Sequence, residues 1–212
     1  YSMGERVLAF EDEFAKKIGS KYSVMVNSGS SANLILVSGC RYLGTPRLLP
    51  GDEVIVPAVS WSTTYYPLYQ YGLKIKFVDI DLHTLNYDLD QLEQAVTDKT
   101  RAIMAVNLLG NPNDFDRIQK IIGGRDIVLM EDNCESLGAT FKGKKAGTFG
   151  VMGTFSTFFS HHISTMEGGL IVTDDEEIYQ ILLSLRAHGW TRNLPKQNHV
   201  CSDKSDDSFE ES

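Results

Sequence analysis

Residues 23–43 read SVMVNSGSSANLILVSGCRYL, a β-rich run followed by small polar residues and then a long apolar run. The first part, Ser23–Val26, predicts a strand, and the last part, Leu34–Leu43, predicts a helix. The small residues between them, Asn27–Asn33, allow a ligand to approach the backbone closely, and their hydroxyls can donate hydrogen bonds. At a helix start they form either a phosphate cradle or an ordinary helix cap. The turn matches neither a Walker loop nor a dinucleotide glycine fingerprint.

The alternation of short apolar runs and helical patterns continues along the chain. Further strands are predicted at Glu53–Val56, Lys74–Val78, Ala102–Val106, Ile127–Met130 and Gly169–Val172, and further helices at Leu8–Ile18 and Asp88–Val96. This alternation predicts an α/β fold, in which helices cover both faces of a mostly parallel sheet. Neither a repeat nor a Gly/Ser-rich linker divides the chain, so we predict one domain.

The composition is that of a globular domain: 42% of the 212 residues are hydrophobic and 23% are charged. A net charge of -8 without a basic run argues against nucleic-acid binding, and no apolar stretch is long enough to cross a bilayer. The scattered cysteines Cys40, Cys134 and Cys201 do not form a zinc ribbon, and we expect no metal site. The first residues lack a signal-peptide pattern, so we expect reduced thiols in a cytoplasm. The expected partners are small molecules and other protein chains.

Two polar or aromatic positions follow predicted strands, where ligands bind in open α/β sheets. The acidic pair Glu131–Asp132 ends the apolar run that begins at Ile127. A carboxylate there either caps the next helix or keeps a pyridine nitrogen protonated, so that the ring withdraws electrons from a substrate. Trp61 follows the run at 53–56, and its indole either lies flat on a cofactor ring or fills the core. The residue type alone favours the core.

In chain order these segments resemble one family, the DegT/DnrJ/EryC1/StrS sugar aminotransferases and dehydratases, which use pyridoxal phosphate (PLP). The resemblance runs from about residue 7 to residue 190 and includes GDEVIVP at 51–57, FVDID at 77–81 and GTFG at 147–150. It implies the aspartate aminotransferase-type (fold type I) large domain. It also implies cofactor-binding residues: Gly29, Ser30 and Ser156 at the phosphate, Trp61 stacked on the ring, Asp132 at the ring nitrogen, and Glu135 on the O3′ side.

The segment SHHISTMEGG at 160–169 departs from that family. The family lysine, which binds the cofactor covalently, is expected six residues before Glu167, and that residue is His161. This replacement resembles the sugar 3-dehydratases of the family. Imidazole does not form a lasting Schiff base but exchanges protons near neutral pH. The resemblance therefore implies that PLP or pyridoxamine phosphate (PMP) is bound non-covalently and that His161 is the catalytic base. The role of the neighbouring His162 stays open.

The implied reaction removes the C3 hydroxyl of a nucleotide sugar. L-Glutamate converts PLP to PMP, whose amine condenses with the C4 ketone of GDP-4-keto-6-deoxy-D-mannose. His161 removes the C4′ proton and returns it to the departing hydroxyl. A 3,6-dideoxy ketosugar for colitose and O-antigen biosynthesis is released with ammonia. The resemblance also implies a homodimer, and we expect the chain to be a fragment that lacks an N-terminal arm and a C-terminal small domain.

Three alternatives stay open. A related CDP-sugar 3-dehydrase shares the histidine but carries an iron–sulfur cluster, whose cysteine cluster is not seen here, and Cys201 alone cannot hold one. An ordinary aminotransferase would need a displaced lysine. The nearest candidates upstream are Lys142, Lys144 and Lys145, but they fall in a predicted hairpin before His161 and so argue against this alternative. A non-catalytic relative would be expected to have lost several of the cofactor-compatible residues that this chain retains.

Overall fold

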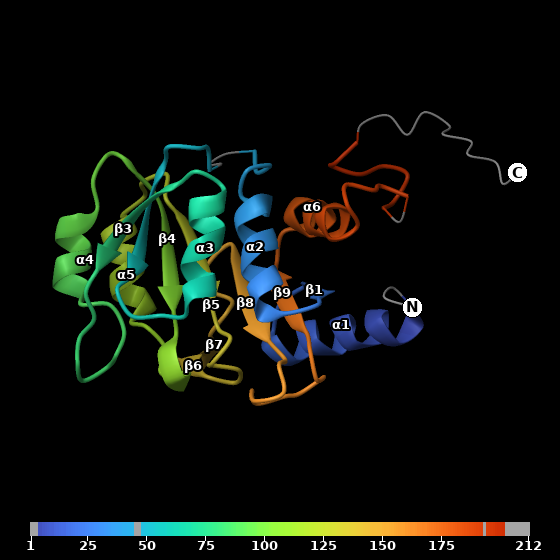
Figure 1. Cartoon of the computed structure of the whole chain (residues 1–212), viewed down its shortest axis with the longest axis horizontal. Coiled ribbons are helices and arrows are strands. Elements are labelled where there is room, and N and C mark those ends of the chain that lie inside the picture. The colour runs from blue at the N-terminus through green and yellow to red at the C-terminus, as the bar shows by residue number, and fades with distance from the viewer. Residues whose placement is uncertain (1–3, 45–47, 193, 202–212) are drawn as a thin grey trace, which may run out of the picture.

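A seven-stranded sheet forms the centre of the computed structural model, which describes residues 4–44, 48–192 and 194–201 (Figure 1). Its strand order is β1-β9-β8-β5-β4-β2-β3. The strands are β1 (Tyr22–Val26), β2 (Glu53–Pro57), β3 (Lys74–Val78), β4 (Thr100–Val106), β5 (Val128–Asp132), β8 (Met152–Ser156) and β9 (Gly169–Thr173). Only β9 runs against its neighbours; the other strands are parallel. The prediction of a mostly parallel sheet is therefore confirmed.

Helices cover both faces of this sheet, as predicted (Figure 1). The helices are α1 (Glu5–Ile18), α2 (Gly29–Gly39), α3 (Ser62–Gln70), α4 (Leu89–Ala95), α5 (Phe115–Ile122) and α6 (Glu176–Arg186), with a short 3-10 turn η1 (Leu108–Gly110). Apolar side chains of α2, α3 and α6 pack on one face, and those of α1, α4 and α5 pack on the other. A small hairpin, β6 (Thr140–Phe141) and β7 (Lys144–Lys145), follows β5.

The predicted elements exist, but several bounds differ. The prediction of a helix at 34–43 was wrong in its bounds, because α2 begins inside the Gly/Ser turn itself: the Ser28 hydroxyl accepts the N–H of Ser31 at 3.0 Å and so caps the helix there. Asp88 caps α4 as expected, accepting the N–H groups of Asp90 and Gln91. The sequence pattern misses β8, because glycine and hydroxyl residues interrupt its apolar run. The acidic tail and the first residues lie partly outside the described residues, at 202–212 and 1–3.

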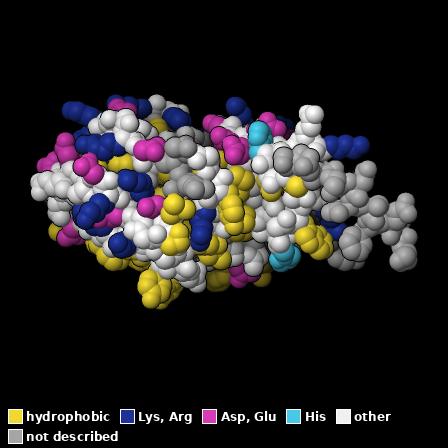
Figure 2. Space-filling view, turned by 90° about the horizontal axis from the view of Figure 1, so that it is seen from above, with side chains coloured by type: hydrophobic (Ala, Val, Ile, Leu, Met, Phe, Trp, Pro, Cys, Tyr) yellow, Lys and Arg dark blue, Asp and Glu magenta, His cyan; other side chains and the backbone are white. Residues whose placement is uncertain are grey.

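The surface is mixed in charge. Acidic and basic side chains are interspersed on the face seen in Figure 2 and form no basic stripe there. In the part of the chain that the structure describes, no helix is both long and apolar enough to span a membrane.

The acidic pair at the end of β5 is divided between the two faces of the sheet, because successive strand side chains point in opposite directions. Glu131 is fully buried on the face covered by α5, and its carboxyl group accepts the N–H groups of Gly147, Phe149 and Gly150 at 2.6, 2.6 and 2.7 Å. Burial raises the pKa of Glu131 to about 7, although these hydrogen bonds lower it. Glu131 therefore fixes the 147–150 turn rather than a ligand.

Replacing Glu131 with glutamine is expected to destabilise the fold by about 1–3 kcal/mol at pH 5, because the amide NH₂ group would face a backbone donor. A protonated carboxyl group still accepts all three N–H groups. The folded state binds the proton of Glu131 more tightly than an exposed glutamate binds its proton. The stability that the protonated Glu131 contributes is therefore full below pH 4.5 and is lost as the pH rises through 7. Urea unfolding should therefore show a difference in the free energy of unfolding between wild type and variant that is smaller at pH 8 than at pH 5. An unchanged or larger difference would contradict this assignment.

Candidate active site

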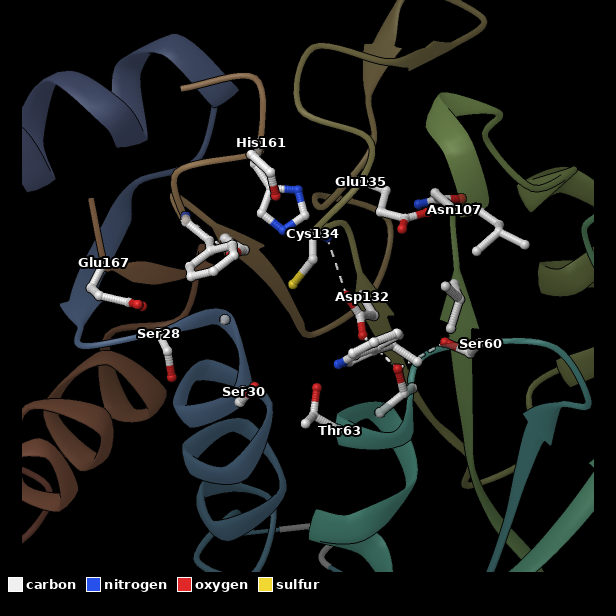
Figure 3. Close-up of a pocket in the computed structure, with 18 residues that line it drawn as sticks. Ser28, Ser30, Ser60, Thr63, Asn107, Asp132, Cys134, Glu135, His161 and Glu167 are labelled. Atoms are coloured by element: carbon white, nitrogen blue, oxygen red, sulfur yellow. Dashed lines mark hydrogen bonds between the residues drawn. The ribbon is translucent and has the colours of Figure 1, made fainter. Parts of the chain in front are cut away.

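The carboxyl edge of the parallel strands contains a cavity of about 470 Å³ (Figure 3). Its lining residues follow β1, β2, β4, β5 and β8, or precede β9, which runs in the opposite direction and so begins at this edge. All seven site residues expected from the sequence line it: Gly29, Ser30, Trp61, Asp132, Glu135, Ser156 and His161. The structure thus brings together residues that lie up to 132 positions apart (161 - 29). Their individual roles toward a ligand stay predictions.

The start of α2 lines this cavity and has the geometry of an anion-binding site. The first N–H groups of a helix have no partner within the helix. In α2 the Ser28 side chain accepts the N–H of Ser31, and the N–H groups of Gly29 and Ser30 come before it at the helix start. A Cβ atom on Gly29 would lie 2.6 Å from Ser156 Cβ and 2.9 Å from Cys134 Sγ. Gly29 is therefore required for the close packing that places the Ser156 hydroxyl beside the helix start.

Replacing Gly29 with alanine is expected to lower the free energy of unfolding by about 1–3 kcal/mol, because the added methyl group overlaps Ser156 and Cys134. Thermal and urea unfolding measure this loss. The matched control is Gly44→Ala, since a Cβ atom on Gly44 meets nothing within 4 Å. Equal stability of the two variants would show that the close packing around Gly29 is not as tight as the structure indicates.

Asp132 lies on the opposite face from Glu131 and points into the cavity (Figure 3). Its Oδ2 accepts hydrogen bonds from Asn33 Nδ2 at 2.8 Å and Thr64 Oγ1 at 2.9 Å, and its Oδ1 accepts the N–H of Cys134 at 3.1 Å. These donors hold a carboxylate that is only 5% exposed. The group can therefore present a fixed negative charge to a cationic ring nitrogen.

Asn33 joins α2, α3 and β5 below this carboxylate. Pro67 has no N–H group, so the Thr63 carbonyl lacks the usual donor four residues later in α3. Asn33 Nδ2 lies 3.4 Å from that carbonyl while it also donates to Asp132. Asn33 Oδ1 in turn accepts from Thr154 Oγ1 at 2.7 Å. The proline in α3 thus leaves the Thr63 carbonyl without its helical donor. That carbonyl helps to orient the Asn33 amide, which in turn supports Asp132.

Trp61 lies at the mouth of the cavity and is 74% exposed, so the expectation that it fills the core was wrong. It precedes α3 in the loop that leaves the sheet at β2 and does not belong to the apolar face of the helix. An indole in that place is accessible to a ligand in the cavity.

Glu135 is not a helix cap, because no helix follows β5; the chain turns into the β6–β7 hairpin instead. Its Oε2 accepts the N–H of Leu109 at 3.1 Å. Leu109 has a left-handed backbone with φ of 52°, which is unfavourable for leucine. Glu135 therefore holds a strained turn beside the cavity. The hairpin carries Lys144 and Lys145 in β7, away from the cavity lining, which leaves a displaced-lysine mechanism without support.

His161 lies in a loop that is closed at its base. The backbone N–H groups of Thr157 and Thr165 bond Gly168 O and Thr157 O, each at 2.9 Å, and the two threonine hydroxyls lie 2.7 Å apart. A Cβ atom on Gly168 would overlap both hydroxyls. Within the loop, the His161 N–H donates to Phe158 O at 3.0 Å and its ring approaches the Phe158 ring edge-on. The imidazole is thereby held at the rim of the cavity.

Asn107 and Cys134 are among the lining residues that the sequence analysis did not assign to the site. Asn107 follows β4, and the rule that selected Asp132, a polar residue directly after an apolar strand, also selects it. Its amide is held by Asn133 and Asn113 in a buried network. Cys134 contributes a thiol, and burial, together with the charge of Asp132, raises the pKa of Cys134 well above its ordinary value. The thiol is therefore neutral and acts as a packing surface.

The chain belongs to the DegT/DnrJ/EryC1/StrS aminotransferase family, whose model matches residues 1–204. This confirms the resemblance and the fold type I architecture expected from it. The chain is 69% identical over 212 residues to GDP-4-keto-6-deoxy-D-mannose 3-dehydratase of Escherichia coli O55:H7, which covers 100% of this chain and 55% of that protein.

Two solved structures are similar throughout the chain. GDP-4-keto-6-deoxymannose-3-dehydratase with a trapped PLP-glutamate geminal diamine superposes with a TM-score of 0.95 at 69% identity, covering 98% of this chain and 54% of that chain. A variant of this enzyme with bound GDP-perosamine also gives 0.95, at 70% identity, covering 99% and 54%. The chain thus spans about half the length of the relatives it matches.

Proposed function

We propose that the protein is a PLP/PMP-dependent lyase that removes the C3 hydroxyl of GDP-4-keto-6-deoxy-D-mannose, with L-glutamate as the amino donor. The observation that carries this proposal is His161 at the rim of a cavity whose described lining contains no lysine. A histidine supports proton transfer without covalent anchoring of the cofactor. The similar dehydratases carry this activity in their names, and the solved structures hold PLP-glutamate and a GDP-sugar.

The residues of the cavity fit this cofactor. Gly29 and Ser30 would hold the phosphate with backbone N–H groups, and Ser156 with its hydroxyl. The fixed carboxylate of Asp132 would keep the ring nitrogen protonated. Trp61 would lie against the ring. When bound, the cofactor supplies an electron-withdrawing ring and an amine that can bond to the sugar C4 ketone.

His161 carries the proton transfers. With the cofactor and sugar bound, its imidazole would take up the proton from C4′ and would then donate a proton to the oxygen that leaves C3. One side chain thus acts first as base and then as acid. The closed base of its loop limits the movement of the ring between these steps.

The same proposal makes residues 1–212 the cofactor-binding large domain of a homodimeric enzyme. The support for the domain assignment is that 98% of this chain superposes on about half of a solved dehydratase. The remainder of such a protein, or its partner subunit, would supply the groups that bind the nucleotide.

The test is to incubate the complete natural protein that carries this sequence with PLP, L-glutamate and GDP-4-keto-6-deoxy-D-mannose. Mass spectrometry of the sugar nucleotide should show the loss of one oxygen, accompanied by ammonia release. Gain of an amino group would identify an aminotransferase, and loss of oxygen from the CDP-linked sugar alone would identify the other dehydratase. An unchanged sugar with either nucleotide would favour a non-catalytic relative.

A further inference from the structure

A second hollow of about 440 Å³ adjoins the cavity on the outer side of His161. It is lined by Leu109, Glu135, Ser160, His161 and His162. Glu135, Ser160 and His161 also line the inner cavity, so the two spaces meet at these residues. Leu109 and His162 belong to the outer hollow alone. Both adjacent histidines therefore line the outer hollow, but only His161 also borders the inner cavity.

The outer hollow lies where a substrate joined to the cofactor would extend; this inference rests on the proposed function. With the ring nitrogen at Asp132, the carbon that carries C4′ is at the opposite side of the pyridine ring. The base that removes the C4′ proton is expected to be His161, which borders both spaces. A sugar bonded at C4′ therefore passes His161 and enters the outer hollow.

The chemistry of the walls favours the sugar ring over the diphosphate. The lining contains two imidazoles, a hydroxyl, a carboxylate and one apolar side chain, and no described lining residue of either space is a lysine or arginine. A diphosphate beside Glu135 without a cationic side chain would be repelled. A neutral pyranose instead offers hydroxyls to the polar groups and C–H bonds to Leu109.

The two walls are pre-formed. Glu135 holds the Leu109 turn through the Leu109 N–H, and Asn111 Nδ2 ties the same turn to Thr84 O at 2.8 Å. The opposite wall is the loop closed by Thr157 and Thr165. Binding a sugar between them requires little ordering of the backbone.

We propose that this outer hollow binds the hexose of the nucleotide sugar, with His162 hydrogen-bonded to a sugar hydroxyl and Leu109 packed against the ring. His162 is then a substrate-binding residue, and His161 alone transfers protons. The two roles differ because His161 borders the inner cavity as well as the outer hollow, whereas His162 borders the outer hollow alone.

The experiment measures kinetics and direct binding with the His162→Asn variant of the complete natural protein. KM for GDP-4-keto-6-deoxy-D-mannose should rise about 3- to 10-fold, as expected for one lost hydrogen bond, with kcat within about twofold. Affinity for free GDP, which lacks the sugar, should stay unchanged. Leu109→Asn, which tolerates the left-handed backbone, should show the same pattern. His199→Asn is the control, because its exposed side chain lies beside α6 and lines neither space.

Three results would overturn the inference: an equal loss of affinity for GDP, which would place the diphosphate in the hollow; a kcat that falls with His162→Asn while KM is unchanged; or no effect at all. Equilibrium binding of the GDP-sugar does not require turnover. If the wild type binds the sugar nucleotide but does not dehydrate it, the proposed function fails, while the difference between binding of GDP-sugar and of GDP still tests the hollow.

Discussion

The His161→Asn variant should dehydrate the GDP-sugar about 10²- to 10⁴-fold more slowly than the wild type, which is the usual contribution of a general acid–base group. Asparagine keeps a polar side chain of similar reach but cannot take up a proton near neutral pH. Because His161 lies at the rim and not at the phosphate cradle, the variant should still bind PLP. Mass spectrometry of the sugar nucleotide measures the rate, and absorbance of the protein after gel filtration measures the bound cofactor.

The neighbouring histidine provides the matched comparison. His162→Asn changes the same residue type in the same loop, yet it should affect KM rather than kcat. If His161→Asn retained most of the activity, the proton-transfer role assigned to His161 would be wrong. If both variants lost kcat equally, the division of roles between the two imidazoles would be wrong, while the site itself would stand.

Asp132→Asn should weaken cofactor binding by about 3–5 kcal/mol, the usual effect of removing one partner of a buried charge pair, which corresponds to about 10²- to 4 × 10³-fold in affinity. The amide lacks the charge that keeps a ring nitrogen protonated. Its NH₂ group would also face donors from Asn33, Thr64 or Cys134, which now meet carboxylate oxygens. Titration with PLP, followed by absorbance or protein fluorescence, measures the affinity.

Loss of affinity must be separated from loss of folding. Urea unfolding without cofactor shows how far Asp132→Asn destabilises the chain, and PLP should stabilise the wild type much more than the variant. The control is Asp116→Asn, which removes an exposed carboxylate paired with Lys142 on the surface. If Asp132→Asn bound PLP as tightly as this control, the pairing of Asp132 with the ring nitrogen would be excluded.

Much of the sheet could be predicted because its strands are short apolar runs with buried side chains on both faces, such as 102–106 and 128–130. The failures have local causes. The small residues at 29–33 have the composition of a turn, but they are helical, because Ser28 caps α2 and the helix begins at Gly29. The apolar pattern of β8 is interrupted by Gly153, Thr154 and Ser156, so the sequence does not reveal this strand. Pairing with β5 and β9 in the sheet stabilises it. Residue type alone favours the core for Trp61, whereas its place at a strand end exposes it, in agreement with the position that the family resemblance implies.

The order of motifs in the chain is sufficient to identify the family and to show that a histidine stands where a lysine is expected, because both depend only on residue type and spacing. The assembly of the site depends on the tertiary structure. Parallel strands bring their carboxyl ends to one edge, and the reversal of β9 returns Glu167 and Gly168 to that same edge. The hydrogen bonds of Asp132 to Asn33 and Thr64 join side chains that are distant in sequence. Loop geometry places His161, but not its neighbour His162, at the border of the inner cavity. Such contacts are set by packing between elements, which residue spacing along one chain does not encode.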